Sequence, residues 1–251
     1  MEQTSAPLAA RLPAATDLLA HAWQIYKDKF KRFLEIYWRG LIGVAPFLAV
    51  LALIALTSKL VTEANLKLPL VSVLIVLGVI TFLGFIYYAV RTQIGLMLYF
   101  EKSENVPAQE IFNNTKNYFW RFLGVTLLNA LLVLLWTLLF IIPGVVFSIY
   151  YTFGTMVLLF EGIGSKAALK RSQELVTGYW WGVLGRFVLL GLIYGVVALI
   201  LSVPNLVLPP SSVYSVIWGG VVQIINFLIG PLFGVYSYLI YKNLVAIKSQ
   251  T

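Results

Sequence analysis

Four polar side chains stand inside apolar stretches of this 251-residue chain, where they have the chemistry for ligand binding or transport. They are Arg91, Asn129, Gln223 and Asn226. An ionisable side chain at membrane depth is costly, so Arg91 is the first candidate for a functional group in a polar route. The alternatives for Arg91 are a side chain that extends to the membrane interface, or one that pairs with Glu101 or Glu161. The three amides are equally suited to hydrogen bonds between helices.

Catalytic chemistry has little support in the sequence. The chain contains one histidine, His21, and no cysteine, which excludes Cys/His zinc sites, disulfides and thiol catalysis. We recognise no nucleophile with a neighbouring base, no phosphate-binding loop and no cluster of metal ligands. We therefore expect no catalytic, cofactor-binding or metal-binding residue, and a protein that is not an enzyme.

The composition is that of a membrane protein. Hydrophobic residues make up 60% of the chain and charged residues 11%, against about 25% charged in soluble domains. Because about 20 apolar residues cross the hydrocarbon core as a helix, we predict an all-α fold with six transmembrane helices. These lie near 34–58, 69–99, 118–142, 144–161, 179–203 and 212–241. Pro143 and Gly144, in the sequence IIPG, predict a tight reversal between the third and fourth.

Lys and Arg residues are distributed unevenly between the two ends of these helices. Sixteen fall at or beside one end, and two, Lys59 and Lys67, fall at the other. The positive-inside rule then puts both termini in the cytoplasm of a multi-pass protein of the bacterial inner (plasma) membrane. No cleavable signal peptide is recognisable in residues 1–33, so we expect the first span to be an uncleaved anchor. The net charge of +8 orients the chain and does not indicate nucleic-acid binding.

Two parts of the chain resemble each other at an offset of 60 residues. GLMLYFEKSENVPAQEIFNNTK (95–116) aligns with TMVLLFEGIGSKAALKRSQELV (155–176). After one extra residue, NYFWRFLG (117–124) aligns with GYWWGVLG (178–185), and DKFKRFLE (28–35) is a weaker third copy. We therefore predict an internal repeat of three similar units. A disordered N-terminus (1–15) precedes a membrane domain (16–248) with units of about 16–100, 105–161 and 164–247.

Each unit is expected to contain an amphipathic elbow helix on the membrane surface, a turn, an aromatic cluster and a pair of spans. The apolar stripes of the three elbow helices are Leu19, Ala22, Trp23 and Tyr26; Ala108, Ile111, Phe112 and Thr115; and Ala168, Leu169, Ser172, Leu175 and Val176. Ser165 is the expected N-cap of the third elbow, and Gly178 its left-handed C-terminal residue. Asp28 and Asn117 occupy the place of Gly178 in the other two units.

The elbows carry basic and aromatic side chains that suit the membrane interface. The candidate contacts with lipid headgroups are Lys116, Arg121, Lys170, Arg171 and Trp180. The simplest role of these segments is to set the depth of the next span. The alternative is that their basic faces bind anionic lipid headgroups or a cytoplasmic protein. Glu101 and Glu161, at the ends of spans, are each expected to pair with an elbow cation.

The run EGIGSKAALKRSQELVTGYWWGVLG, after a span that contains IIPG, resembles the membrane domain of the glycerophosphoryl diester phosphodiesterase membrane-domain family and of related uncharacterised bacterial six-span proteins. The sequence Lys170-Arg171-Ser172, with Leu175, Gly178 and Trp180, carries this likeness, which covers about residues 15–245. The resemblance implies an architecture and no catalytic motif. The separate hydrolase domain that often accompanies such membrane domains has no counterpart in this sequence.

These observations predict a non-catalytic polytopic membrane protein, a scaffold or accessory component whose elbow helices contact membrane lipids. We expect no cofactor and no nucleic-acid partner. The alternative is a transporter, channel or lipid-translocating protein with a polar route near Arg91, Gln223 and Asn226.

Overall fold

The computed structural model describes residues 12–60, 64–101, 106–207 and 213–250, and within these ranges the chain is helical and has no strand. The helices are α1 (Ala15–Leu60), α2 (Ala64–Glu101), α3 (Ala108–Asn114), the 3-10 helix η1 (Thr115–Tyr118), α4 (Phe119–Leu139), α5 (Ile141–Tyr151), α6 (Gly154–Glu161), α7 (Ser165–Val176), α8 (Trp180–Val207) and α9 (Val213–Lys248). Six helical stretches of the described chain are long and apolar enough to cross a membrane. The prediction of an all-α chain with six membrane-length helices is confirmed.

The chain divides into two compact units, Lys29–Leu123 on the one hand and Met1–Asp28 with Gly124–Thr251 on the other. We call them the middle unit and the terminal unit. Their boundaries fall within α1 and α4, so they do not coincide with the three units expected from the repeat. Residues 1–11 of the predicted disordered N-terminus lie outside the described residues.

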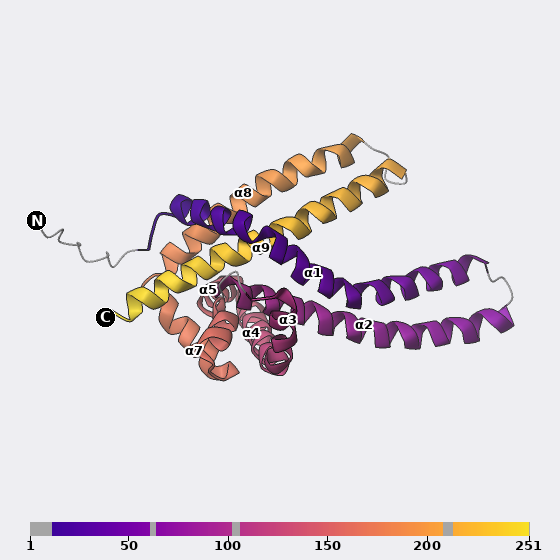
Figure 1. The fold of residues 1–251 in the computed structure, drawn as a ribbon, viewed down its shortest axis with the longest axis horizontal. Coiled ribbons are helices and arrows are strands. Elements are labelled where there is room, and N and C mark those ends of the chain that lie inside the picture. Colours follow the sequence, from indigo (N-terminus) through magenta and orange to yellow (C-terminus); the bar gives the residue numbers. More distant parts are fainter. Residues whose placement is uncertain (1–11, 61–63, 102–105, 208–212, 251) are drawn as a thin grey trace, which may run out of the picture. The chain divides into compact units, whose positions relative to one another are not determined.

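In the middle unit, α1 and α2 pack as an antiparallel hairpin (Figure 1). Gly40 lies against Thr92, and Phe47 stacks on Phe85 with 5.6 Å between ring centroids. The order of these pairs, rising along α1 and falling along α2, fixes the antiparallel register. A methyl group on Gly40 would lie 2.3 Å from Thr92 Oγ1, so the glycine permits the close approach of the two helices.

The helix α3 and the 3-10 helix η1 pack against α2 and bury the apolar stripe that the sequence predicts. The buried residues are Ala108, Ile111, Phe112 and Thr115. The expected turn at Asn117 is wrong, because this residue lies in η1, which leads directly into α4. The expected turn at Asp28 is also wrong, since α1 continues through it as one 46-residue helix. A left-handed backbone costs a residue with a side chain about 1–2 kcal/mol, whereas a continued helix keeps its hydrogen bonds.

In the terminal unit, α4 and α5 are joined by a reversal at Phe140, whose backbone is extended (φ −157°, ψ 141°). The reversal comes three residues before the predicted Pro143. This proline is accepted in the first turn of α5, where a backbone N–H has no helical partner. Trp136 and Phe147 stack across the hairpin with 4.3 Å between ring centroids.

The helix α7 buries all five predicted residues, Ala168, Leu169, Ser172, Leu175 and Val176. Gly178 has a φ of +87°, as expected for the residue that ends this helix and turns the chain towards α8. The predicted N-cap is wrong, because Gly164 occupies that position and Ser165 is the first helical residue.

We predict that Gly144→Ala destabilises the α4–α5 hairpin. A methyl group at this position would lie 2.2 Å from Thr137 Oγ1 and 2.9 Å from the Thr137 Cα, so rotation of one side chain cannot relieve the overlap. Overpacking of this kind costs about 1–3 kcal/mol. Thermal unfolding of the protein in detergent, followed by tryptophan fluorescence, should show a lower Tm for this variant.

The control for this experiment is Gly185→Ala in α8, since a Cβ at Gly185 meets no atom within 4 Å. Alanine is the better helix former by about 0.5–1 kcal/mol, so the control should be at least as stable as the wild type. Equal Tm values for Gly144→Ala and Gly185→Ala would contradict the packing described for the hairpin.

Candidate functional site

Arg91 lies on α2 in the middle unit and is buried, with 4% of its surface exposed. Its Nε donates to Thr115 Oγ1 at 2.8 Å, and its Nη2 donates to the Phe112 carbonyl at 2.6 Å. The Thr115 hydroxyl donates to the same carbonyl at 2.6 Å. The guanidinium carbon is 4.2 Å from the centre of the Phe112 ring and 5.3 Å from that of Tyr87. Arg91 therefore holds the last turn of α3 against α2.

A cation suits this position because the last carbonyls of a helix lack helical partners and carry its negative dipole. Gly95 lies one turn after Arg91. A Cβ there would be in ordinary contact with Thr115, at 3.6 Å from a methyl carbon, and in tighter contact with Ile36 of α1, at 3.3 Å. The side chain of Arg91 is buried against α3. Its expected position near the membrane interface stays a prediction. The expected pairing with Glu101 or Glu161 is wrong, since no ion pair between described residues includes Arg91.

The fourth predicted span is interrupted between α5 and α6, at Thr152 and Phe153, and the side chain of Ser172 fills the interruption. Ser172 Oγ donates to the Tyr150 carbonyl at 2.7 Å and accepts from the Phe153 N–H at 3.1 Å. Ser172 is fully buried on α7. One hydroxyl thus satisfies a backbone acceptor and a backbone donor that the interrupted helix leaves without helical partners, and it attaches α7 to the span.

The other polar candidates all belong to the terminal unit, and no described contact brings them together. Tyr194 on α8 donates its hydroxyl proton to Asn226 Oδ1 on α9 at 3.1 Å, so the expected hydrogen bond between helices is confirmed for this amide. Asn129 Oδ1 is buried and accepts no hydrogen bond from a described residue. Gln223 is exposed on α9.

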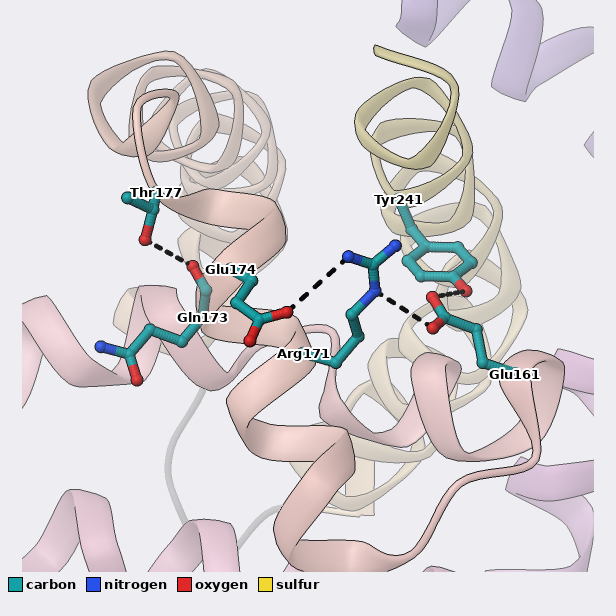
Figure 2. Close-up of polar contacts among 6 residues, drawn as sticks. All are labelled: Glu161, Arg171, Gln173, Glu174, Thr177 and Tyr241. Carbon is teal, nitrogen blue, oxygen red and sulfur yellow. Dashed lines mark hydrogen bonds and ion pairs between the residues drawn. The ribbon is translucent and has the colours of Figure 1, made fainter. Parts of the chain in front are cut away.

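Glu161, at the end of α6, joins three helices of the terminal unit (Figure 2). Its two carboxylate oxygens accept from Arg171 Nε of α7 at 3.1 Å and from the Tyr241 hydroxyl of α9 at 3.2 Å. Arg171 also pairs with Glu174 at 3.8 Å. The expected pairing of Glu161 with an elbow cation is confirmed. Because Arg171 is about a third exposed, this pairing is screened by solvent and serves position more than stability.

The candidate lipid contacts differ in their exposure and in their hydrogen-bond and ion-pair partners. Lys116, Arg121 and Lys170 are exposed, whereas Arg171 is engaged by the two carboxylates. Trp180 is directed inward, and its Nε1 donates to the Val146 carbonyl of α5 at 3.2 Å. In the aromatic clusters at the start of α4 and of α8, Trp120 (77%) and Trp181 (78%) are exposed, and the sequence alignment pairs these two residues with each other. Because Trp181 aligns with Trp120, the alignment could have indicated Trp181 and not Trp180 as the candidate lipid contact.

Arg186 is a further structural cation, which the sequence indicates only as one of the sixteen basic residues that orient the chain. From α8 it donates to the carbonyls of Gly182 (2.6 Å), Leu12 (2.9 Å) and Pro13. The residues just before α1, which fall within the predicted disordered segment 1–15, are therefore attached to α8. Sequence spacing cannot identify the contact of Arg186 with Leu12 and Pro13, since these two partners are backbone groups more than 170 residues away along the chain.

No three His, Cys, Asp or Glu side chains in the described ranges come close enough to hold a metal ion. Compared with protein-family models, curated proteins and solved structures, the chain matches none of them.

We predict that Ser172→Ala destabilises the junction of α5 and α6, because it leaves the Tyr150 carbonyl and the Phe153 N–H without a side-chain partner. A buried polar group that loses its partner costs about 1–3 kcal/mol. Hydrogen exchange followed by mass spectrometry should show faster exchange in peptides that contain the Phe153 amide, together with a lower Tm.

The matched control is Ser148→Ala on α5, whose hydroxyl donates to the Val145 carbonyl of its own helix. A substitution at such a position usually changes stability by no more than about 0.5 kcal/mol. Unchanged exchange at Phe153 in Ser172→Ala would show that the hydroxyl does not hold the junction.

Proposed function

We propose that this protein is a non-catalytic, multi-pass component of the bacterial inner membrane, a scaffold or accessory protein whose elbow helices contact lipid headgroups. The observation that carries the proposal is the position of exposed cations and tryptophans at the start of two spans. Lys116 and Trp120 flank the start of α4, and Lys170 and Trp181 flank the start of α8. Tryptophan and lysine together favour the boundary between headgroups and lipid tails.

The surface of the long helices supports the membrane part of the proposal. Large aliphatic side chains on α2 and α8 are more than half exposed, among them Ile80 and Leu83 (60% and 61%) and Leu192 and Leu199 (64% and 70%). A soluble protein rarely exposes continuous apolar surface on this scale, whereas lipid tails cover it without cost.

The burial pattern supports the repeated use of one elbow device. Ala108, Phe112 and Thr115 on α3 and η1, and the residues 60 positions later on α7, are all buried. At the start of the following span the aligned Phe122 and Val183 are buried, while Trp120 and Trp181 are exposed. A threefold arrangement of such units stays a prediction, as does the resemblance to the phosphodiesterase membrane-domain family.

The alternative, a transporter or channel, has less support from the polar residues. In the middle unit the guanidinium of Arg91 is held by α3, and in the terminal unit Asn226 is held by Tyr194. Each contact is local, as expected of groups that join helices and not of groups that line an open route.

We predict that cysteines introduced one at a time will be labelled from opposite sides of the membrane, at Ser58 from outside and at Lys166 and Ser249 from the cytoplasm. The chain has no cysteine, so Lys166→Cys on α7, Ser249→Cys beyond α9 and Ser58→Cys near the end of α1 are each uniquely labelled. In intact cells, a thiol reagent that does not cross membranes should label only Ser58→Cys, and permeabilised cells should label all three. Labelling of Lys166→Cys and Ser58→Cys from the same side would exclude the proposed orientation.

We predict that Lys116→Gln with Lys170→Gln weakens the preference of the protein for anionic lipid. Each lysine near an anionic surface contributes about 1 kcal/mol, so the double variant should lose roughly tenfold or more in this preference. Reconstitution in vesicles of phosphatidylcholine with a small share of phosphatidylglycerol, followed by measurement of the lipid that co-purifies, tests this. An unchanged ratio of the two lipids would contradict headgroup binding by the elbows, whose role would then be to position the next span.

A further inference from the structure

Arg91 carries a full positive charge at a site with 4% exposure, and it forms no ion pair with any acid in the part of the chain that the structure describes. Its hydrogen-bond acceptors are both neutral, the hydroxyl of Thr115 and the carbonyl of Phe112. Burial of a charge without an opposite charge is expensive. Arg171 differs, since it is about a third exposed and still has two carboxylates beside it.

The contacts of Arg91 leave part of its guanidinium unused. Nε and Nη2 each donate one hydrogen bond, and Nη1 donates to no described residue. A guanidinium has five N–H donors, so Nη1 retains both of its own. The surrounding rings of Tyr87, Tyr88 and Phe112 attract the cation through their faces but accept no strong hydrogen bond.

The partial charge at the end of α3 balances only part of the Arg91 charge. A helix end is equivalent to roughly half an elementary charge, and α3 has only 7 residues. A net positive charge with free donors therefore remains where α2 meets α3. Lys116, exposed and next to Thr115 in the chain, adds a second cation to this part of the middle unit.

We propose that Arg91 binds the oxygen of a phosphate group through Nη1, at the junction of α2 and α3. This inference rests on the proposed function, which puts α3 at the level of the lipid headgroups, where the phosphates of phospholipids are the abundant anions. A guanidinium matches phosphate oxygens in geometry and is less strongly hydrated than an ammonium group. The bound phosphate would neutralise Arg91 and hold the elbow at the membrane surface.

The test measures phospholipid bound to the wild type and to Arg91→Gln. Both proteins are purified in detergent, depleted of lipid, given phosphatidylglycerol, and examined by native mass spectrometry. Loss of one charge-assisted hydrogen bond corresponds to about a tenfold loss of affinity, so Arg91→Gln should retain about tenfold less lipid. The control is Lys59→Gln, which removes one exposed charge near the far end of α1 and should retain lipid like the wild type.

A second arm distinguishes a lipid headgroup from free phosphate. Inorganic phosphate, added to the lipid-depleted proteins against a chloride control of equal ionic strength, should raise the Tm of the wild type and not that of Arg91→Gln if the ligand is the free ion. If the wild type retains more phosphatidylglycerol than Arg91→Gln does, the ligand is a lipid headgroup. Equal lipid retention by both proteins, with no phosphate-dependent difference in Tm, would overturn the proposal.

Circular dichroism first establishes that Arg91→Gln keeps its helix content. If it does not, Arg91→Lys replaces it, since a lysine keeps the charge but presents a point charge instead of a planar fork. Weaker retention by Arg91→Lys than by Lys59→Gln would support the proposal, and equal retention would overturn it. The side-labelling experiment and the Lys116 and Lys170 substitutions test the elbows separately, so the two proposals can fail independently.

Discussion

A backbone carbonyl or N–H that is buried away from water and left without a partner is costly. This constraint explains the positions of three polar side chains. Arg91 donates to a carbonyl at the end of α3, Ser172 donates to a carbonyl at the interruption of a span, and Arg186 donates to carbonyls that precede α1. Each contact lies where the hydrogen-bond ladder of a helix ends.

Two of these contacts attach a short helix to the span before it, and they do so in opposite directions. In the middle unit the donor is Arg91 on the span, and the acceptor is the carbonyl of Phe112 on the short helix. In the terminal unit the donor is Ser172 on the short helix, and the acceptor is on the span. Ser172 stands 60 positions after Phe112, so equivalent places in the alignment contribute a backbone group in one case and a side chain in the other.

Composition and periodicity were sufficient to predict the helices and the buried faces of α3 and α7, because hydrophobic burial leaves a regular trace in the sequence. Gly178 was predictable since few residues other than glycine adopt its backbone conformation. The continuation of α1 through Asp28 as one helix was not predictable, because the residue types near this position suit both a turn and a helix. The partners of Arg91 and the interruption at Phe153 were hidden for another reason. Their hydrogen bonds involve backbone groups, which every residue has, so spacing carries no signal for them.

The hydroxyl of Ser172 links two events that would otherwise be independent. It fills the interruption in the span between α5 and α6 only while α7 is docked, since the same oxygen serves a carbonyl and an N–H of that span. If α7 moved away, both backbone groups would lose their partner at the same moment, and the span would have to rebuild its helical ladder to recover them. Undocking of α7 and rearrangement of this span should therefore occur together as one cooperative transition, without a stable state in which only one of them has happened.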